Sequence, residues 1–176
     1  MCAQFDVLLS EEQINSRIAE LAAEIDRDYA GKEVVFLITL RGAVIFGCEL
    51  AKRVKTPVYF EFIQTSSYVG TTSTGIITMK IDVDTSAIEG KHVIIIEDII
   101  DTGKTLKMVK KLILDRKPAS LKICTLIDKH ECRKVELEGD YIGFTIGNDF
   151  IVGYGLDYNQ KYRNLPYIGI YDESKA

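Results

Sequence analysis

Apolar positions along this chain follow two different patterns. In the first, apolar residues recur every three or four positions, as on the buried face of a helix. These residues are Ile14, Ile18, Leu21 and Ile25. Ser10 and Gln13 stand where a capping box would close the first turn of that helix. A second set, around Leu106, Val109 and Ile113, predicts another amphipathic helix.

The second pattern is a continuous apolar run, typical of a strand buried on both faces. Residues 34–40 form such a run, with several β-branched members; residues 92–96 are the most apolar predicted strand, and residues 121–127 are another predicted strand. Further strands are predicted at 58–64, 75–79, 141–146 and near Tyr167, and a helix at 42–53. Between the strands at 58–64 and 75–79, the polar stretch SSYVGTTST has no core pattern and predicts a loop.

The predicted strands alternate with helices over the first two-thirds of the chain. This order is typical of an α/β fold with a mostly parallel central sheet flanked by helices. No repeat or linker divides the sequence, so residues 1–176 are expected to form a single domain. Ligands of such sheets bind at the carboxyl ends of the strands. Functional residues are therefore expected where these strands end.

Composition narrows the function classes. The formal net charge is -4, which argues against nucleic-acid partners and anionic membranes. No apolar run approaches the roughly 18 residues of a membrane span, and no secretory signal pattern is seen. The four cysteines lack zinc-binding spacing; Cys48 and Cys124 lie in apolar runs and are interpreted as core residues. These observations predict a cytoplasmic protein.

The stretch VIIIEDIIDTGKTL, residues 93–106, carries the most chemistry. Gly103, Lys104 and Thr105 match the second half of a P-loop, but Asp98 stands where the first glycine of that motif should be. A turn at a helix N-terminus still suits a phosphate. The preceding carboxylates suit hydroxyl groups and a divalent cation. Together they predict a phosphorylated sugar as the ligand.

The same stretch resembles the phosphoribosyl-diphosphate (PRPP) signature of type I phosphoribosyltransferases. EDIIDTGKT is similar to the form found in hypoxanthine-guanine phosphoribosyltransferases. The resemblance implies the type I phosphoribosyltransferase fold, with a small hood subdomain and a flexible lid loop. It also implies that PRPP is bound, through its 5'-phosphate and ribose, by a set of seven residues. These are Glu97, Asp98, Asp101, Thr102, Gly103, Lys104 and Thr105.

Four further stretches, in the family's order, extend the resemblance over almost the whole chain. Leu40, Arg41 and Gly42 resemble the diphosphate loop, which has a cis peptide bond before the basic residue. Ser67 and Tyr68 resemble the lid. Lys129 resembles the residue that donates to the exocyclic oxygen of a 6-oxopurine. The remaining matches are Phe150, Ile151 and Asp157 beside the purine, and Arg163 beside the diphosphate.

The reaction implied by the resemblance joins hypoxanthine or guanine to PRPP, giving IMP or GMP and diphosphate. Asp101 would be the general base, and Mg²⁺ would be held by Glu97, Asp98 and Asp157. Family members are usually dimers or tetramers, so a homodimer or homotetramer is expected. His92 and His130 show no metal-like partner and are interpreted as non-catalytic. The alternatives are a PRPP-sensing regulatory protein that binds nucleic acid, and a transferase that prefers pyrimidines or xanthine.

Overall fold

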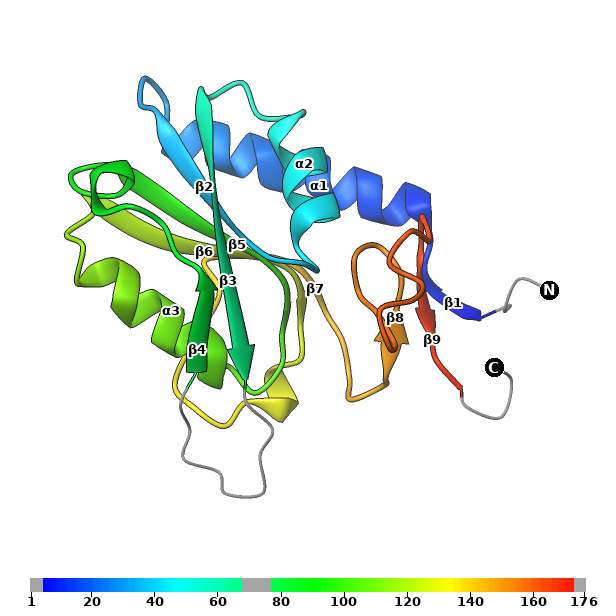
Figure 1. Cartoon of the computed structure of the whole chain (residues 1–176). Coiled ribbons are helices and arrows are strands. Elements are labelled where there is room, and N and C mark those ends of the chain that lie inside the picture. The colour runs from blue at the N-terminus through cyan, green and yellow to red at the C-terminus, as the bar shows by residue number, and fades with distance from the viewer. Residues whose placement is uncertain (1–4, 68–76, 173–176) are drawn as a thin grey trace.

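The computed structural model describes residues 5–67 and 77–172 (Figure 1). In chain order the elements are β1 (Asp6–Leu9), α1 (Glu11–Asp28), β2 (Val34–Thr39), α2 (Val44–Ala51), β3 (Val58–Ser67), β4 (Ile77–Ile81), the 3₁₀ turn η1 (Thr85–Ala87), β5 (His92–Ile100), α3 (Lys104–Leu114), β6 (Ser120–Asp128), the 3₁₀ turn η2 (His130–Cys132), β7 (Tyr141–Thr145), β8 (Ile151–Val152) and β9 (Ile168–Ile170). Among the described helices, none is long and apolar enough to cross a membrane.

The main sheet has six strands in the order β4-β3-β2-β5-β6-β7. All pairs are parallel except β3 with β4, which form an antiparallel hairpin. The predicted α/β class with a mostly parallel sheet is therefore confirmed. The chain runs from β2 through α2 outward to β3, but from β5 through α3 in the opposite direction to β6. This reversal opens a crevice between the carboxyl ends of β2 and β5.

Alternate residues of the central strands supply two separate cores. One face of the sheet, with Phe36, Ile38 and Ile94, packs with α1 and α2. The other face, with Val35 and Leu37, packs with α3 (Figure 1). Burial on both faces explains why these strands are uninterrupted apolar runs in the sequence.

Two helices form as their sequence patterns predict. In α1 the capping box is present: the backbone N–H of Ser10 donates to Gln13 Oε1 at 2.8 Å, and that of Gln13 to Ser10 Oγ at 3.3 Å. Its predicted apolar face is buried. In α3, Leu106, Val109 and Ile113 are buried, and Gly103 precedes the helix with a φ of 76°. Glycine adopts this left-handed conformation without a steric cost.

A second, three-stranded sheet in the order β1-β9-β8 forms the small hood beside the carboxyl ends of the main strands (Figure 1). It joins segments from opposite ends of the sequence, since Asp6 is paired with Ile170 and Ile151 also faces Ile170. The sequence pattern anticipated only the segment near Tyr167, because strands as short as β8 have no recognisable alternation.

Several boundaries differ from the predictions. The hairpin strand predicted at 75–79 lies at Ile77–Ile81, and β5 continues to Ile100 rather than ending at position 96. Glu97 and Asp98 therefore lie within the strand, held by its pairing with β6. The interpretation of Cys48 as a core residue is wrong: it is exposed, because α2 buries Phe46, Gly47 and Leu50 on its other side. Cys124 is buried, as expected.

Candidate active site

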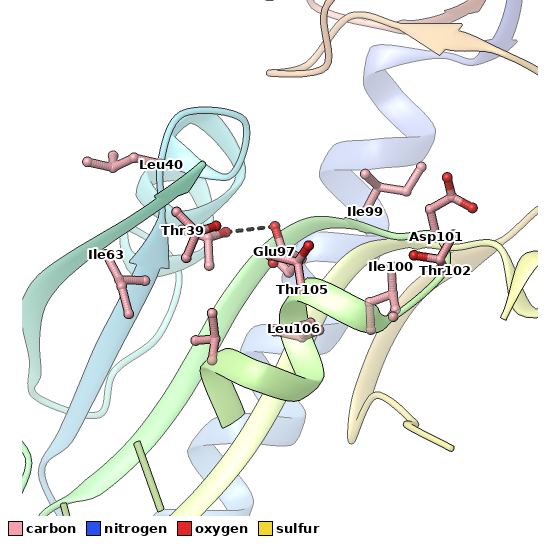
Figure 2. A pocket seen from close by; sticks show the side chains of 13 residues that line it. Thr39, Leu40, Ile63, Glu97, Ile99, Ile100, Asp101, Thr102, Thr105 and Leu106 are labelled. Atoms are coloured by element: carbon pink, nitrogen blue, oxygen red, sulfur yellow. Dashed lines mark hydrogen bonds between the residues drawn. The ribbon is translucent and has the colours of Figure 1, made fainter. Parts of the chain in front are cut away.

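The crevice between β2 and β5 brings a hydroxyl group onto a carboxylate. Thr39, the last residue of β2, donates its Oγ1 hydrogen bond to Glu97 Oε1 at 2.7 Å. The same oxygen lies 2.9 Å from the carbonyl oxygen of Ile96. This contact follows from the parallel register, which places Ile38 opposite Ile96 and so brings the next residues together. Figure 2 shows Thr39 and Glu97 facing each other, with Thr105 close by.

A cavity of about 200 Å³ lies over this contact. Its lining combines the end of β2, the end of β5 and the first turn of α3 (Figure 2). The lining residues include Thr39, Leu40, Glu97, Asp101, Thr102, Gly103 and Thr105. Six of these seven, all but Thr39, were predicted from the sequence. The strands and the helix thus bring the predicted phosphate loop, residues 101–105, and Leu40 of the predicted diphosphate loop, residues 40–42, to one cavity.

Glu97 and Asp98 form an adjacent, half-buried carboxylate pair. Burial, followed by the neighbouring charge of Asp98, raises the pKa of Glu97 well above its usual value. Burial also raises the pKa of Asp98, although the hydrogen bond with Glu97 and the N–H of Ile99 oppose that change. A bound cation would favour the ionised form of both groups. Oxygen donors in this number suit Mg²⁺, which keeps waters and substrate oxygens as its other ligands.

The diphosphate loop lies against Asp98. The peptide bond between Leu40 and Arg41 is cis, as the resemblance implied. A Cβ atom added to Gly42 would lie 1.5 Å from Asp98 Oδ2, and one added to Gly155 would lie 2.0 Å from the carbonyl oxygen of Gly42. These two glycines therefore let β5, the diphosphate loop and the hood approach one another at one point.

The loop from Asp101 to Thr105 turns β5 into α3. Gly103 is buried and makes no side-chain cap, so the N-terminal N–H groups of α3 have no side-chain acceptor at that position. Asp101, Lys104 and Thr105 are exposed, and Thr102 is half-buried. An uncapped helix N-terminus beside exposed polar side chains is an arrangement that accommodates an anion.

Lys129 follows the neighbouring strand β6. Its backbone N–H donates to the carbonyl oxygen of Ile100 at 2.9 Å, so Lys129 and Asp101 stand at the ends of paired strands. The Lys129 side chain is buried, and its Nζ donates to the carbonyl oxygen of Asp149 at 2.6 Å. Next to Asp149, the ring of Phe150 is 52% exposed, whereas Ile151 is buried in β8.

The two predicted diphosphate-binding arginines meet at Gln160. Its Oε1 accepts hydrogen bonds from Arg41 Nη1 and Arg163 Nη2, each at 3.3 Å. Arg163 also pairs with Asp157 Oδ1 at 2.7 Å, and the other carboxylate oxygen of Asp157 accepts the backbone N–H of Gln160 at 2.8 Å. Sequence reasoning missed Thr39, Gly155 and Gln160, because only long-range contacts assign them to the site.

The three predicted magnesium ligands do not form one compact group. Within residues 5–67 and 77–172, Glu97, Asp98 and Asp157 are not among the groups of three whose ligand atoms lie within 4.8 Å of one another. The group that satisfies this distance is Asp128, His130 and Glu138, so the expectation that His130 has no metal-like partner is wrong. Its Asp128 is already paired with Arg133. Ser67 ends β3, and Tyr68 lies outside the described residues.

Comparisons with known proteins agree with this geometry. The family model described as the phosphoribosyl transferase domain matches residues 5–159. A hypoxanthine-guanine phosphoribosyltransferase of Streptococcus pneumoniae is 49% identical over 168 residues, 95% of this chain and 93% of the relative. One from Lactococcus lactis is 48% identical over 165 residues, 93% of this chain and 89% of the relative.

Solved structures are similar throughout. The crystal structure of a hypoxanthine-guanine phosphoribosyltransferase from Bacillus anthracis superposes with a TM-score of 0.91 at 45% identity, covering 96% of this chain and 100% of that chain. A hypoxanthine phosphoribosyltransferase from Staphylococcus aureus gives 0.91 at 46% identity, covering 96% and 92%. With the family model matching most of its length, the chain belongs to the phosphoribosyltransferase family.

Proposed function

We propose that this enzyme transfers the 5-phosphoribosyl group of PRPP to hypoxanthine or guanine, giving IMP or GMP and diphosphate in purine salvage. The observation that carries the proposal is the pairing of β5 with β6, which sets the loop from Asp101 to Thr105 beside the buried Lys129. A phosphate site and a fixed ammonium donor thus share one edge of the sheet. The curated relatives of similar sequence have the corresponding name.

Phosphate binding is assigned to Thr102, Gly103, Lys104 and Thr105. Their backbone N–H groups and the positive end of α3 would hold the 5'-phosphate. Arg41 and Arg163 would bind the diphosphate, with the backbone of Leu40 and Gly42 beside it. Gln160 already holds the two guanidinium groups near each other without adding charge. The two cations would then stabilise the negative charge that develops on the leaving group.

We assign one Mg²⁺ to the adjacent carboxylates of Glu97 and Asp98 and a second to Asp157, and when bound these ions would neutralise the diphosphate charge. The carboxylates of Glu97 and Asp98 would also face the developing positive charge of the ribose and stabilise it as the bond to diphosphate lengthens. Ser67 and Tyr68 are proposed to belong to the lid that excludes water during this step.

The purine would stack on Phe150, near Ile151 and Asp157. Lys129 Nζ would donate to the 6-oxo group, which favours oxopurines over adenine. Asp101 would take the proton from N7. Since Asp101 is exposed before substrate binds, we attribute its effectiveness to the acidifying effect of Lys129 on the purine and to burial by the substrates themselves.

Cytoplasmic action in the form of a homodimer or homotetramer, with residues 1–176 as one domain, completes the proposal. The described cysteines Cys48, Cys124 and Cys132 are unpaired, as is typical of a reducing compartment.

Exposed Phe60, Phe62 and Ile81 on the β3–β4 hairpin would be covered by a second copy. Light scattering of the purified enzyme at several concentrations measures the oligomeric state, and a monomer at all concentrations would contradict this part.

The deciding experiment supplies PRPP and Mg²⁺ with hypoxanthine, guanine, xanthine, adenine or uracil separately. Nucleotide formation with hypoxanthine or guanine is expected, with none from adenine or uracil and a loss of turnover on chelation of Mg²⁺. The ratio of kcat/KM values for hypoxanthine, guanine and xanthine ranks the bases. No turnover with either hypoxanthine or guanine would contradict the proposal.

A further inference from the structure

Arg133 lies behind the phosphate loop, in a segment that no sequence motif marked. It follows the turn η2 at the end of β6, and only 8% of its side-chain surface is exposed. Its Nη2 is ion-paired with Asp128 Oδ1, and the Asp128 side chain is 3% exposed. Asp128 directly precedes Lys129. The guanidinium is therefore anchored at the end of β6, directly before the proposed purine-binding lysine.

The other end of the same guanidinium contacts the loop. Arg133 Nη1 donates to the backbone carbonyl oxygen of Asp101 at 2.5 Å. The next residue, Lys134, donates its backbone N–H to the carbonyl oxygen of Thr102 at 3.0 Å. A Cβ on Gly103 would lie 2.9 Å from Arg133 Cδ, so the loop packs directly on this side chain. Two successive carbonyl groups of the loop are thus bound by residues 133 and 134.

Because each peptide unit is planar, these two contacts also fix the directions of backbone N–H groups in the loop. In a trans peptide unit the N–H points opposite to the C=O. Holding the Asp101 carbonyl toward Arg133 therefore turns the N–H of Thr102 away from it. Holding the Thr102 carbonyl toward Lys134 does the same for the N–H of Gly103. These N–H groups are among those to which phosphate binding is assigned above.

One N–H donor of the Arg133 guanidinium is in an unfavourable environment. Arg133 Nε is buried and has no hydrogen-bond partner within the described part of the chain. A buried unpaired donor costs free energy, and such groups are uncommon in folded proteins. The Arg133 conformation thus satisfies Asp128 and the Asp101 carbonyl while leaving a third donor unpaired.

We propose that Arg133 is a positioning residue of the transferase reaction. It links Asp128, beside the purine-binding Lys129, to the carbonyl of Asp101, and so fixes both the phosphate-binding N–H groups and the proposed general base relative to the purine. The inference rests on the proposed function. It assigns Arg133 no contact with either substrate.

The test is Arg133→Lys, which retains the positive charge opposite Asp128. A single ammonium lacks the two-ended fork of a guanidinium, so it cannot keep both contacts in the same geometry. The KM for PRPP is expected to rise about tenfold, on the scale of one charge-assisted hydrogen bond. The KM for hypoxanthine should stay within about twofold, since the anchor beside Lys129 retains its charge pair. Arg27→Lys, on the exposed surface of α1, is the matched control and should leave both values unchanged.

A second variant separates the loss of the Arg133 contacts from misfolding caused by an unpaired buried charge. Asp128→Asn with Arg133→Gln removes both charges of the buried pair, so no uncompensated carboxylate remains. It should show the same selective rise in the KM for PRPP. Thermal unfolding and circular dichroism establish that each variant is folded before kinetics are compared.

The outcomes distinguish failure of the proposed function from failure of the positioning role of Arg133. An inactive wild-type enzyme refutes the proposed function itself. An active wild type with unchanged kinetics in folded Arg133→Lys overturns the positioning role. A parallel rise in both KM values together with a loss of thermal stability, or failure of both variants to fold, would also overturn it and make Arg133 a structural residue.

Discussion

The phosphate loop, residues 101–105, and the hood edge, residues 149–163, reach the same site by different means. The loop is one continuous strand-turn-helix connection, with a single left-handed residue at Gly103. The hood edge folds back on itself through isolated bridges and several left-handed residues. These are Gly153, Tyr154, Gly155, Asn159, Gln160 and Tyr162. Non-glycine residues in this conformation persist where surrounding contacts hold them.

This difference suggests a division of labour. The loop offers backbone N–H groups and a carboxylate at fixed places, whereas the hood edge offers side chains whose positions depend on one another. Substitutions in the loop should therefore change the chemical step and PRPP binding. Substitutions of Phe150 and Ile151 in the hood edge should change purine binding, whereas substitution of Arg163 should change diphosphate binding. Gly155 of the hood edge approaches Gly42 of the diphosphate loop, which in turn packs on Asp98 of β5.

The largest effect is expected from Asp101→Asn in the loop. The amide cannot accept the N7 proton, so kcat should fall about 100-fold or more, the scale of general-base contributions. KM for PRPP should change only a few-fold, because the loop backbone is retained. Steady-state kinetics with hypoxanthine measure both, and Asp115→Asn at the far end of α3 is the control. A near-normal kcat would remove Asp101 from the role of base.

Gly42→Ala tests the packing of the diphosphate loop against β5 and the hood edge. The new methyl group would overlap Asp98 Oδ2, at 1.5 Å, and displace either the carboxylate or the diphosphate loop. A displacement of about 1 Å in a catalytic site costs on the order of 100-fold in rate. The kcat/KM for PRPP should fall by that amount.

The matched control for that change is Gly147→Ala. A Cβ at position 147 meets nothing within 4 Å in the described structure. It should leave kcat/KM unchanged. Equal effects of the two substitutions would show that the packing of Gly42 on Asp98 has no functional role.

Phe150→Ala probes the hood edge alone. Loss of the exposed ring removes the proposed stacking surface, and base stacking on an aromatic side chain is worth about tenfold or more in affinity. KM for hypoxanthine should rise about tenfold, with KM for PRPP nearly unchanged. Tyr59→Ala, equally exposed at 52% but at the start of β3, is the control. An effect of Phe150→Ala on PRPP alone would break the proposed division of labour.

The smallest effect should come from Asp82→Asn, which touches neither region. Asp82 accepts hydrogen bonds from Arg116 Nη2 at 2.7 Å, and Arg116 thereby holds the pKa of Asp82 below its usual value. A carboxyl group with a lowered pKa stabilises the fold above its ordinary pKa of about 4, and loses this contribution as the pH falls through the lowered value.

At pH 7 Asp82→Asn should reduce the free energy of unfolding by about 0.5 to 1 kcal/mol, since the carboxylate is half-exposed and screened. The difference from wild type should disappear in strongly acidic solution, while kcat stays unchanged. Urea unfolding across pH measures this, with exposed Asp84→Asn as the control. A difference that persists at low pH would exclude the ion pair as its cause.

The contrast between loop and hood edge also explains what the sequence could predict. The loop, the buried strands and the capping box of α1 are local patterns, so residues close in sequence determine them. Gln160 and Gly155 gain their places from Arg41, Arg163 and Gly42, more than 100 residues away in two of these cases. In the sequence Arg133 looks like any surface arginine, because only the pairing of β5 with β6 brings it beside the loop. The exposure of Cys48 depended on which side of α2 meets the sheet.

The hydrogen bond from Lys129 to Asp149 has a consequence for selectivity. A free lysine side chain samples many rotamers, and immobilising one costs roughly 1.5 to 2 kcal/mol. For Lys129 this entropy cost is part of the free energy of folding, because the ammonium is already fixed before a base binds. Two of its three N–H bonds remain for the incoming oxygen. With Lys129 in the proposed role, an oxopurine would meet a preorganised donor, while the 6-amino group of adenine would meet one that cannot rotate away.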